Sequence, residues 1–192
     1  NDIVRAMKWM YEYQYNPGKK ITGNWWDWEI GTPQEVMNIL VLMHDVMPQE
    51  LLNQYLAAID KFVPDPKKRV ANPAAVETGA NLLDKALVVT LRGIVGKQAS
   101  KIEQGRDSIT NEFLHVKQGD GVYEDGSLVQ HKNIAYTGSY GSVLLGRMAD
   151  LFLLFADSPW AITDPNAHHV YDWVGRSFEP LIYKGAMMDS VK

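Results

Sequence analysis

The fold class is decided by the stretch ANLLDKALVVTLRGIV, which occupies residues 80–95. Apolar side chains recur along it at helical spacing through Leu83, Leu91 and Ile94, and Thr90 is the polar residue on this stripe. The spacing predicts one long helix. Because most of its residues are apolar, this helix must be packed against other parts of the chain.

Signals for helix starts and ends divide the rest of the chain into further helices. Thr32 can cap a helix, Pro33 suits the first helical position, and Glu35 stands where a capping box needs a glutamate. Apolar periodicity predicts the other helices over residues 2–15, 32–43, 48–63, 99–116, 140–155 and 167–179. No segment shows sustained strand-type alternation. The sequence predicts a single all-α domain over residues 1–192, built of antiparallel helical hairpins.

Composition excludes several classes of protein. The 192 residues are 46% hydrophobic and 22% charged, as in an ordinary globular domain. A formal charge of −4 argues against nucleic acid as a partner. The chain has no cysteine for a disulfide or a thiolate metal site. The apolar run at residues 151–156 is far shorter than the roughly 20 residues of a membrane span, so no membrane association is expected.

The first residues carry no targeting signal. Residues 1–5 lack the basic start and apolar middle of a signal peptide. They read as the middle of a helix, so we expect the chain to be part of a longer protein.

The stretch DGSLVQHKNIAYTGSYG, residues 125–141, concentrates groups that can do chemistry. His131, with an ordinary pKa of about 6.5, can take or give a proton at neutral pH, and the hydroxyl of Tyr140 can do the opposite. The alternative is a histidine that only holds the loop by hydrogen bonds. Asn81, at the start of the long helix, can donate its amide to an anionic oxygen, or it can simply cap that helix.

Trp25, Trp26 and Trp28 alternate with acidic residues in one loop. Flat aromatic faces are what sugar rings pack against, so we expect a carbohydrate platform here, while for Trp28 we favour a structural role between helices. Asp27 and Glu29 are candidates for the paired carboxylates of a glycosidase, but we expect them to point in different directions.

Other motifs give no sharper prediction. His168-His169 is a helix-surface pair rather than a metal site, because adjacent helical residues do not face the same way. The sequence has no nucleophile elbow, phosphate loop or dinucleotide fingerprint, so no cofactor is predicted.

Three motifs together resemble polysaccharide lyase family 8, which holds the bacterial hyaluronate, chondroitin AC and xanthan lyases. They are NWWDWEIGTP at residues 24–33, GANLLD at residues 79–84, and the stretch at residues 125–141. They come in the family's order, and the resemblance runs over essentially the whole chain. It implies an incomplete α/α toroid of paired helices, seen here as a part, without the family's β-sandwich domains.

The resemblance also implies a reaction by β-elimination on a uronic acid. Asn81 would hydrogen-bond the substrate carboxylate, His131 would assist in taking the C5 proton or hold the carboxylate, and Tyr140 would deliver a proton to the leaving oxygen. The family divides these roles differently among its members, so the base is not fixed. The substrate-binding residues that it implies are Asn24, Trp25, Trp26 and Tyr136, with no cofactor and no metal.

An acidic polysaccharide is the partner that the resemblance implies, with hyaluronan or chondroitin as the leading substrates. A xanthan-type substrate is the first alternative, and a non-catalytic carbohydrate-binding toroid is the second. Secretion and a monomeric parent enzyme are further expectations from the family.

Overall fold

The computed structural model describes residues 2–192 and divides them into two compact units. The first unit comprises residues 2–77 and 84–105, and the second comprises residues 78–83 and 106–192. Each unit is described by itself below. The single domain over residues 1–192 remains a prediction.

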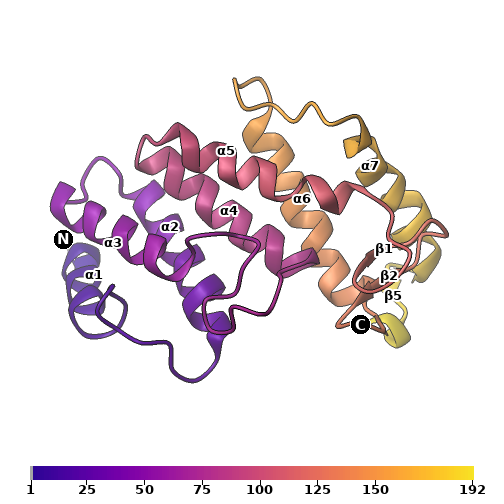
Figure 1. Ribbon diagram of the computed structural model, residues 1–192, viewed down its shortest axis with the longest axis horizontal. Coiled ribbons are helices and arrows are strands. Elements are labelled where there is room, and N and C mark those ends of the chain that lie inside the picture. The colour runs from indigo at the N-terminus through magenta and orange to yellow at the C-terminus, as the bar shows by residue number, and fades with distance from the viewer. Residues whose placement is uncertain (1) are drawn as a thin grey trace. The chain divides into compact units, whose positions relative to one another are not determined.

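The first unit is helical. Its elements are α1 (Asp2–Tyr13), the π-helical turn η1 (Asp27–Gly31), α2 (Thr32–Leu42), α3 (Gln49–Phe62), most of α4 (Gly79–Val95) and most of α5 (Ala99–Ser108). Figure 1 shows α1, α2 and α3 packed together in indigo and violet.

Apolar faces of these helices form one core in the first unit. Tyr55 is fully buried there, and its hydroxyl donates a hydrogen bond to the Met7 carbonyl oxygen at 2.7 Å. Burial in this core raises the pKa of Tyr55 far above its ordinary value. Other buried members of the core are Val36, Met37, Leu40, Leu52, Leu56, Ile59, Phe62, Val88 and Val89.

The helix predicted to start at Thr32 is present as α2, but Thr32 does not cap it. Helical structure already begins at Trp25, and the Asn24 side-chain oxygen accepts a hydrogen bond from the Trp26 N–H at 3.2 Å. The N–H of Thr32 donates to Asp27, five residues back, in a wide π-helical turn. Because Pro33 has no N–H to donate, a wide turn just before it costs little. Asn24 therefore takes the capping role that the sequence suggested for Thr32.

The second unit combines helices with short strands. Its helical elements are η2 (Thr110–Phe113), η3 (Thr137–Gly141), α6 (Ser142–Phe155), η4 (Pro165–His168), α7 (His169–Trp173), η5 (Val174–Phe178), η6 (Glu179–Leu181) and η7 (Asp189–Val191). Its core holds buried Phe113, Leu144, Met148, Leu151, Phe155 and Trp173. The rings of Phe113 and Phe152 meet edge to face at a centroid distance of 5.9 Å.

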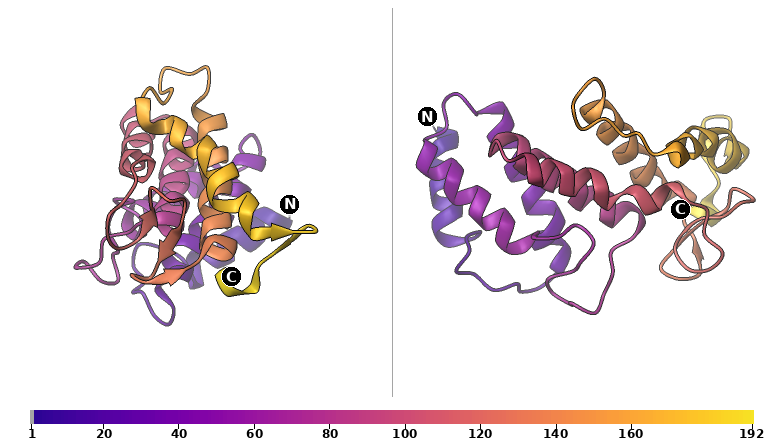
Figure 2. Two further views of the ribbon diagram at one scale, coloured as in Figure 1. Left: turned by 90° about the vertical axis from the view of Figure 1, so that its right-hand side faces the viewer. Right: turned by 45° about the horizontal axis from the view of Figure 1, so that its top comes forward.

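Two small antiparallel sheets complete the second unit. The strands β1 (Gly121–Val122), β2 (Leu128–Gln130) and β3 (Ile134–Ala135) pair in the order β1-β2-β3, with Val129 opposite both Gly121 and Ala135. The strands β4 (Ile182–Tyr183) and β5 (Ala186–Met187) form a hairpin, which projects as a narrow yellow arm in Figure 2.

The observed elements confirm the all-α class and change its details. The predicted helix over residues 99–116 ends as an α-helix at Ser108 and continues only as a 3-10 turn. Strands of two or three residues are too short to give an alternating pattern, so the sequence did not reveal them. No helix within residues 2–192 has the length and apolarity needed to cross a membrane.

Candidate functional site

Three of the predicted site residues form an aromatic cluster in the second unit. The ring centroids of His131 and Tyr140 lie 4.8 Å apart, with the ring planes at 85°. Tyr136 lies 6.1 Å from His131 and 5.0 Å from Tyr140, again between centroids. His131 is exposed, whereas the two tyrosines are half-buried. The histidine can therefore meet a ligand from solvent, with the Tyr140 ring packed against it.

Local backbone geometry brings this cluster together. Strand β2 ends at Gln130, and His131 and Lys132 then adopt left-handed conformations with φ of 55° and 74°. The chain turns back into β3, and the wide turn η3 follows. The Tyr136 carbonyl oxygen accepts a hydrogen bond from the Gly141 N–H at 2.9 Å, which folds Tyr140 back toward Tyr136.

Sequence reasoning missed Asp120, whose carboxylate lies beneath this turn. It accepts hydrogen bonds from the Lys132 N–H at 2.6 Å, the Gln130 amide at 2.9 Å and the Thr78 hydroxyl at 3.0 Å. An aspartate between two glycines at residues 119–121 was the available signal. That pattern reads as an ordinary turn, so it did not identify the contact.

Asn81 lies in the first turn of α4, in the same unit as His131. Its side chain is only 8% exposed. Within residues 2–192 no side-chain hydrogen bond of Asn81 is formed, so the capping interpretation has no contact to support it. A nearly buried amide with unused donors can hydrogen-bond an anionic group of a ligand.

The start of α4 is held by an unusual carboxylate. Glu112 accepts a hydrogen bond from the Gly79 N–H at 3.0 Å. Burial raises the pKa of Glu112 to about 7, helped by the nearby charge of Asp120 and opposed by the Gly79 hydrogen bond. Gly79 has φ of 56°, a conformation that favours glycine.

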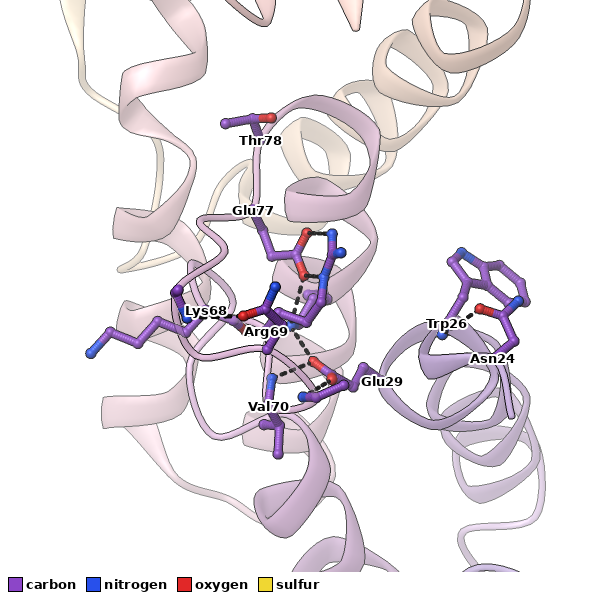
Figure 3. Close-up of polar contacts among 12 residues, drawn as sticks. Asn24, Trp26, Glu29, Lys68, Arg69, Val70, Glu77 and Thr78 are labelled. Atoms are coloured by element: carbon purple, nitrogen blue, oxygen red, sulfur yellow. Dashed lines mark hydrogen bonds and ion pairs between the residues drawn. The ribbon is translucent and has the colours of Figure 1, made fainter. Parts of the chain in front are cut away.

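The tryptophan loop belongs to the first unit. Trp26 is 39% exposed, and a hollow of about 410 Å³ lies beside it, lined by Met10 of α1, by Asp27 and Gly31 of η1, and by residues of α2. A Cβ atom on Gly31 would come within 2.4 Å of the Trp26 ring, so the ring can occupy this position only because residue 31 has no side chain. Figure 3 shows Asn24 beside Trp26, with the hydrogen bond between them.

Trp28 differs from its two neighbours. Its ring lies 5.1 Å from Phe62 and 6.0 Å from Tyr15 between centroids, and its indole N–H donates to the Thr22 carbonyl oxygen at 2.8 Å. The structural role expected for Trp28 is therefore confirmed. Trp25 is half-buried, with the Arg69 guanidinium carbon 3.7 Å from its ring centroid. A cation at this distance fixes the ring by cation–π attraction.

Glu29 lies at the centre of a buried network in the first unit (Figure 3). It is fully buried, and its carboxylate accepts bonds from the Lys85 ammonium at 2.8 Å and from the backbone N–H groups of Val70 and Ala71 at 2.9 and 2.8 Å. Asp27, by contrast, is exposed. The two carboxylates point to different surroundings, as expected, and do not form a glycosidase pair.

The same network reaches the tryptophan loop through a second carboxylate. Glu77 receives two hydrogen bonds of 3.0 Å from Arg69 and lies 3.5 Å from the Lys85 ammonium. The Lys85 ammonium also donates to the carbonyl oxygen of Lys68. The structure thus connects the Arg69 beneath Trp25 to a buried lysine and two buried carboxylates.

The adjacent histidines make backbone contacts. Nδ1 of His168 lies 2.6 Å from the Pro165 carbonyl oxygen, and Nδ1 of His169 lies 2.8 Å from that of Phe113. Throughout the described part of the chain, no group of three or more His, Asp or Glu side chains is placed to hold a metal ion.

The fold and these clusters define a helical domain, with aromatic rings at the surface of one unit and a histidine–tyrosine cluster in the other. The family model described as "Polysaccharide lyase family 8, N terminal alpha-helical domain" matches residues 1–192. The chain belongs to this family.

Curated relatives include different lyases. The chain is 38% identical to a xanthan lyase of Bacillus sp. (strain GL1) over 100% of its length, and 39% identical to hyaluronate lyase HylB of Enterococcus faecalis over 98%. It covers 20% of each of these two relatives. The chain therefore spans about a fifth of their length.

Solved structures similar to this chain are also polysaccharide lyases with different substrates. A chondroitin AC lyase of Streptomyces coelicolor A3 in complex with chondroitin sulphate is 39% identical, with a TM-score of 0.94 over 100% of this chain and 26% of that one. A Paenibacillus xanthan lyase has a TM-score of 0.89 at the same identity, covering 18% of that chain. These likenesses agree with the fold and do not select one substrate.

Proposed function

We propose that the protein carrying this chain cleaves a uronic-acid-containing polysaccharide by β-elimination, with hyaluronan or chondroitin as substrate. The observation that carries the proposal is the His131–Tyr140 contact, with ring centroids 4.8 Å apart, in the unit that also holds the unbonded Asn81 amide. The lyase names of the relatives support the reaction class.

The chemistry fits these side chains. The uronic acid loses its C5 proton, the C5–H electrons form the C4–C5 double bond, and the C4–O bond breaks, so the leaving oxygen takes a proton. Charge develops on the substrate carboxylate as the C5 proton leaves. Asn81 donates its amide to that carboxylate from a nearly buried position and stabilises the charge.

His131 and Tyr140 handle the protons. His131 assists in taking the C5 proton or holds the carboxylate, and Tyr140 delivers a proton to the leaving oxygen. Either an imidazole or a phenol can act as the base, so the base is assigned by the pH profiles of His131→Ala and Tyr140→Phe.

Substrate binding is assigned to aromatic and amide side chains. Trp25 and Trp26 offer ring faces for sugars, Asn24 supplies hydrogen bonds beside them, and Tyr136 frames the catalytic cluster. We further propose that the protein is secreted, because its polymeric substrate lies outside the cell. A monomeric state is proposed from the resemblance to the family.

A time course with hyaluronan, chondroitin sulfate and xanthan tests the proposal. Ultraviolet absorbance of the conjugated double bond and reducing ends are followed together in the same tube. Both signals should rise on hyaluronan or chondroitin sulfate. Reducing ends without absorbance would indicate hydrolysis. A rise of both signals on xanthan alone would show that the substrate is xanthan instead of hyaluronan or chondroitin, in keeping with the xanthan lyase among the relatives.

Variants separate a lyase from a non-catalytic module. His131→Ala and Tyr140→Phe should each lower kcat by at least about a hundredfold while polysaccharide binding persists. Asp27→Asn separates a hydrolase from a lyase, because a hydrolase would depend on this exposed carboxylate for turnover and the proposed lyase would not. A wild-type protein that binds the polymers without any turnover would favour the module.

A further inference from the structure

We propose that Asp120 is a positioning residue that holds His131 in its reactive orientation and links its turn to the start of the helix that carries Asn81. This inference rests on the proposed function. Asp120 contacts neither the imidazole nor a reacting atom, and it acts through the backbone.

Both oxygens of the Asp120 carboxylate are used. Oδ1 accepts the Lys132 N–H at 2.6 Å, and Oδ2 accepts the Gln130 amide at 2.9 Å and the Thr78 hydroxyl at 3.0 Å. The bonds to residues 130 and 132 lie on either side of His131. Hydrogen bonds to an ionised carboxylate are stronger than those between neutral groups.

The turn needs such support because its backbone is strained. His131 and Lys132 both have positive φ, at 55° and 74°, and neither is a glycine. Left-handed conformations are sparsely populated by such residues and persist only where surrounding contacts fix them. The hydrogen bond from the Lys132 N–H to Asp120 holds the second of these two left-handed residues.

The third bond reaches the start of α4. Thr78 immediately precedes Gly79, where a Cβ atom would come within 2.2 Å of the Gln130 side-chain oxygen. Gln130 therefore lies directly against the first residue of the helix. Asp120 therefore connects the end of β2, just before His131, to the start of α4, just before Asn81, and all of these residues lie in one unit.

The charges around Asp120 are consistent with this role. Glu112, which accepts the Gly79 N–H, is the acidic neighbour whose pKa the Asp120 charge helps to raise. Asp120 thus lies close enough for its charge to act on the carboxylate that holds the start of α4.

The test compares Asp120→Asn with Asp125→Asn in the protein at its full natural length. The first substitution keeps the size of the side chain but replaces one accepting oxygen by an NH₂ group. Asp125 is a matched control in the same loop, since its carboxylate accepts two bonds from Ser127 at 2.9 and 2.7 Å. The control makes no contact with the His131 turn.

We expect Asp120→Asn to lower kcat about tenfold to a hundredfold, with KM changed less than about threefold, because a misplaced catalytic group slows chemistry without weakening sugar binding. Asp125→Asn should leave both constants unchanged. Unchanged kcat in Asp120→Asn, or an equal loss in the control, overturns the proposal. A shift of KM alone overturns it as well.

Hydrogen–deuterium exchange gives a reading that does not depend on turnover. The amides of residues 128–136 should exchange faster in Asp120→Asn than in wild type, and unchanged exchange there overturns the proposed support of the turn. Faster exchange in an enzyme with undiminished kcat overturns the positioning role. A wild type without elimination activity overturns the proposed function instead, and the exchange rates still report the turn.

Thr78→Val covers the case in which Asp120→Asn does not fold. This variant removes one donor to the carboxylate and no charge. A fall in kcat of about threefold supports the link to α4, and an unchanged kcat refutes it.

Discussion

Replacing Lys85 with methionine tests the buried network most directly. The Lys85 side chain is fully buried, and its ammonium lies 2.8 Å from Glu29 and 3.5 Å from Glu77. Methionine has a similar volume and no charge. The substitution therefore removes the cation with little change in packing and leaves two carboxylates in the interior.

The expected magnitude follows from the remaining contacts. Breaking a buried ion pair by removing one partner costs about 3–5 kcal/mol. Glu29 keeps two backbone N–H bonds and Glu77 keeps its two bonds from Arg69, so we expect the lower end, about 3 kcal/mol. For a chain of this size, this lowers Tm by about 6–12 °C.

The assay is thermal and urea unfolding of wild type, Lys85→Met, Glu29→Gln and the double variant. Because the two side chains interact, the double variant should lose at least about 1 kcal/mol less than the sum of the single losses. Lys8→Met is the matched control, since Lys8 is exposed on α1 and should change stability by no more than about 0.5 kcal/mol. The reasoning is refuted if Lys85→Met behaves like Lys8→Met, or if the two losses simply add.

Two further predictions concern Glu112 and the Trp26 platform. The folded-state pKa of Glu112, about 7, lies above its ordinary value of 4.5. Protonated Glu112 therefore contributes up to about 3 kcal/mol to the free energy of unfolding, and this contribution is fully present below pH 4.5 and is lost as the pH rises through 7. Glu112→Gln should remove this part of the pH dependence, as measured by urea unfolding from about pH 4.5 to about pH 8; an unchanged pH profile would contradict the assignment. Gly31→Ala should displace the Trp26 ring, because the new Cβ would lie 2.4 Å from it, and should raise KM several-fold with kcat nearly constant. Gly146→Ala on α6 is the control, because a Cβ atom there would meet no other atom within 4 Å. Equal KM and kcat for the two variants would argue against a role of Trp26 in sugar binding.

Much of the helical architecture could be predicted because helix signals are local. Apolar spacing located α3 and α4 to within about two residues, since burial of one face is encoded in neighbouring positions. The bounds of α2 were predicted as well, but the residue that caps this helical segment was not. Asn24 and Thr32 offer similar capping groups, and only the π-helical turn between them decides which one is used.

The histidine–tyrosine cluster was also visible in the sequence. His131, Tyr136 and Tyr140 lie within ten residues of one another, so their proximity follows from the short chain between them. The contacts that hold the His131 turn come from Asp120 and were not visible. The roles of the three clustered residues rest on the family and remain predictions.

Only the tertiary structure revealed the groups that support these residues. Glu29 and Lys85 are 56 residues apart, and Asp120 meets Thr78 across 42 residues. A charged residue gives the same sequence signal whether it meets solvent or a buried partner. The apolar pattern of a chain determines which faces are buried, whereas the pairing of its buried charges is decided when distant segments fold together, because an unpaired charge in the interior is too costly to persist.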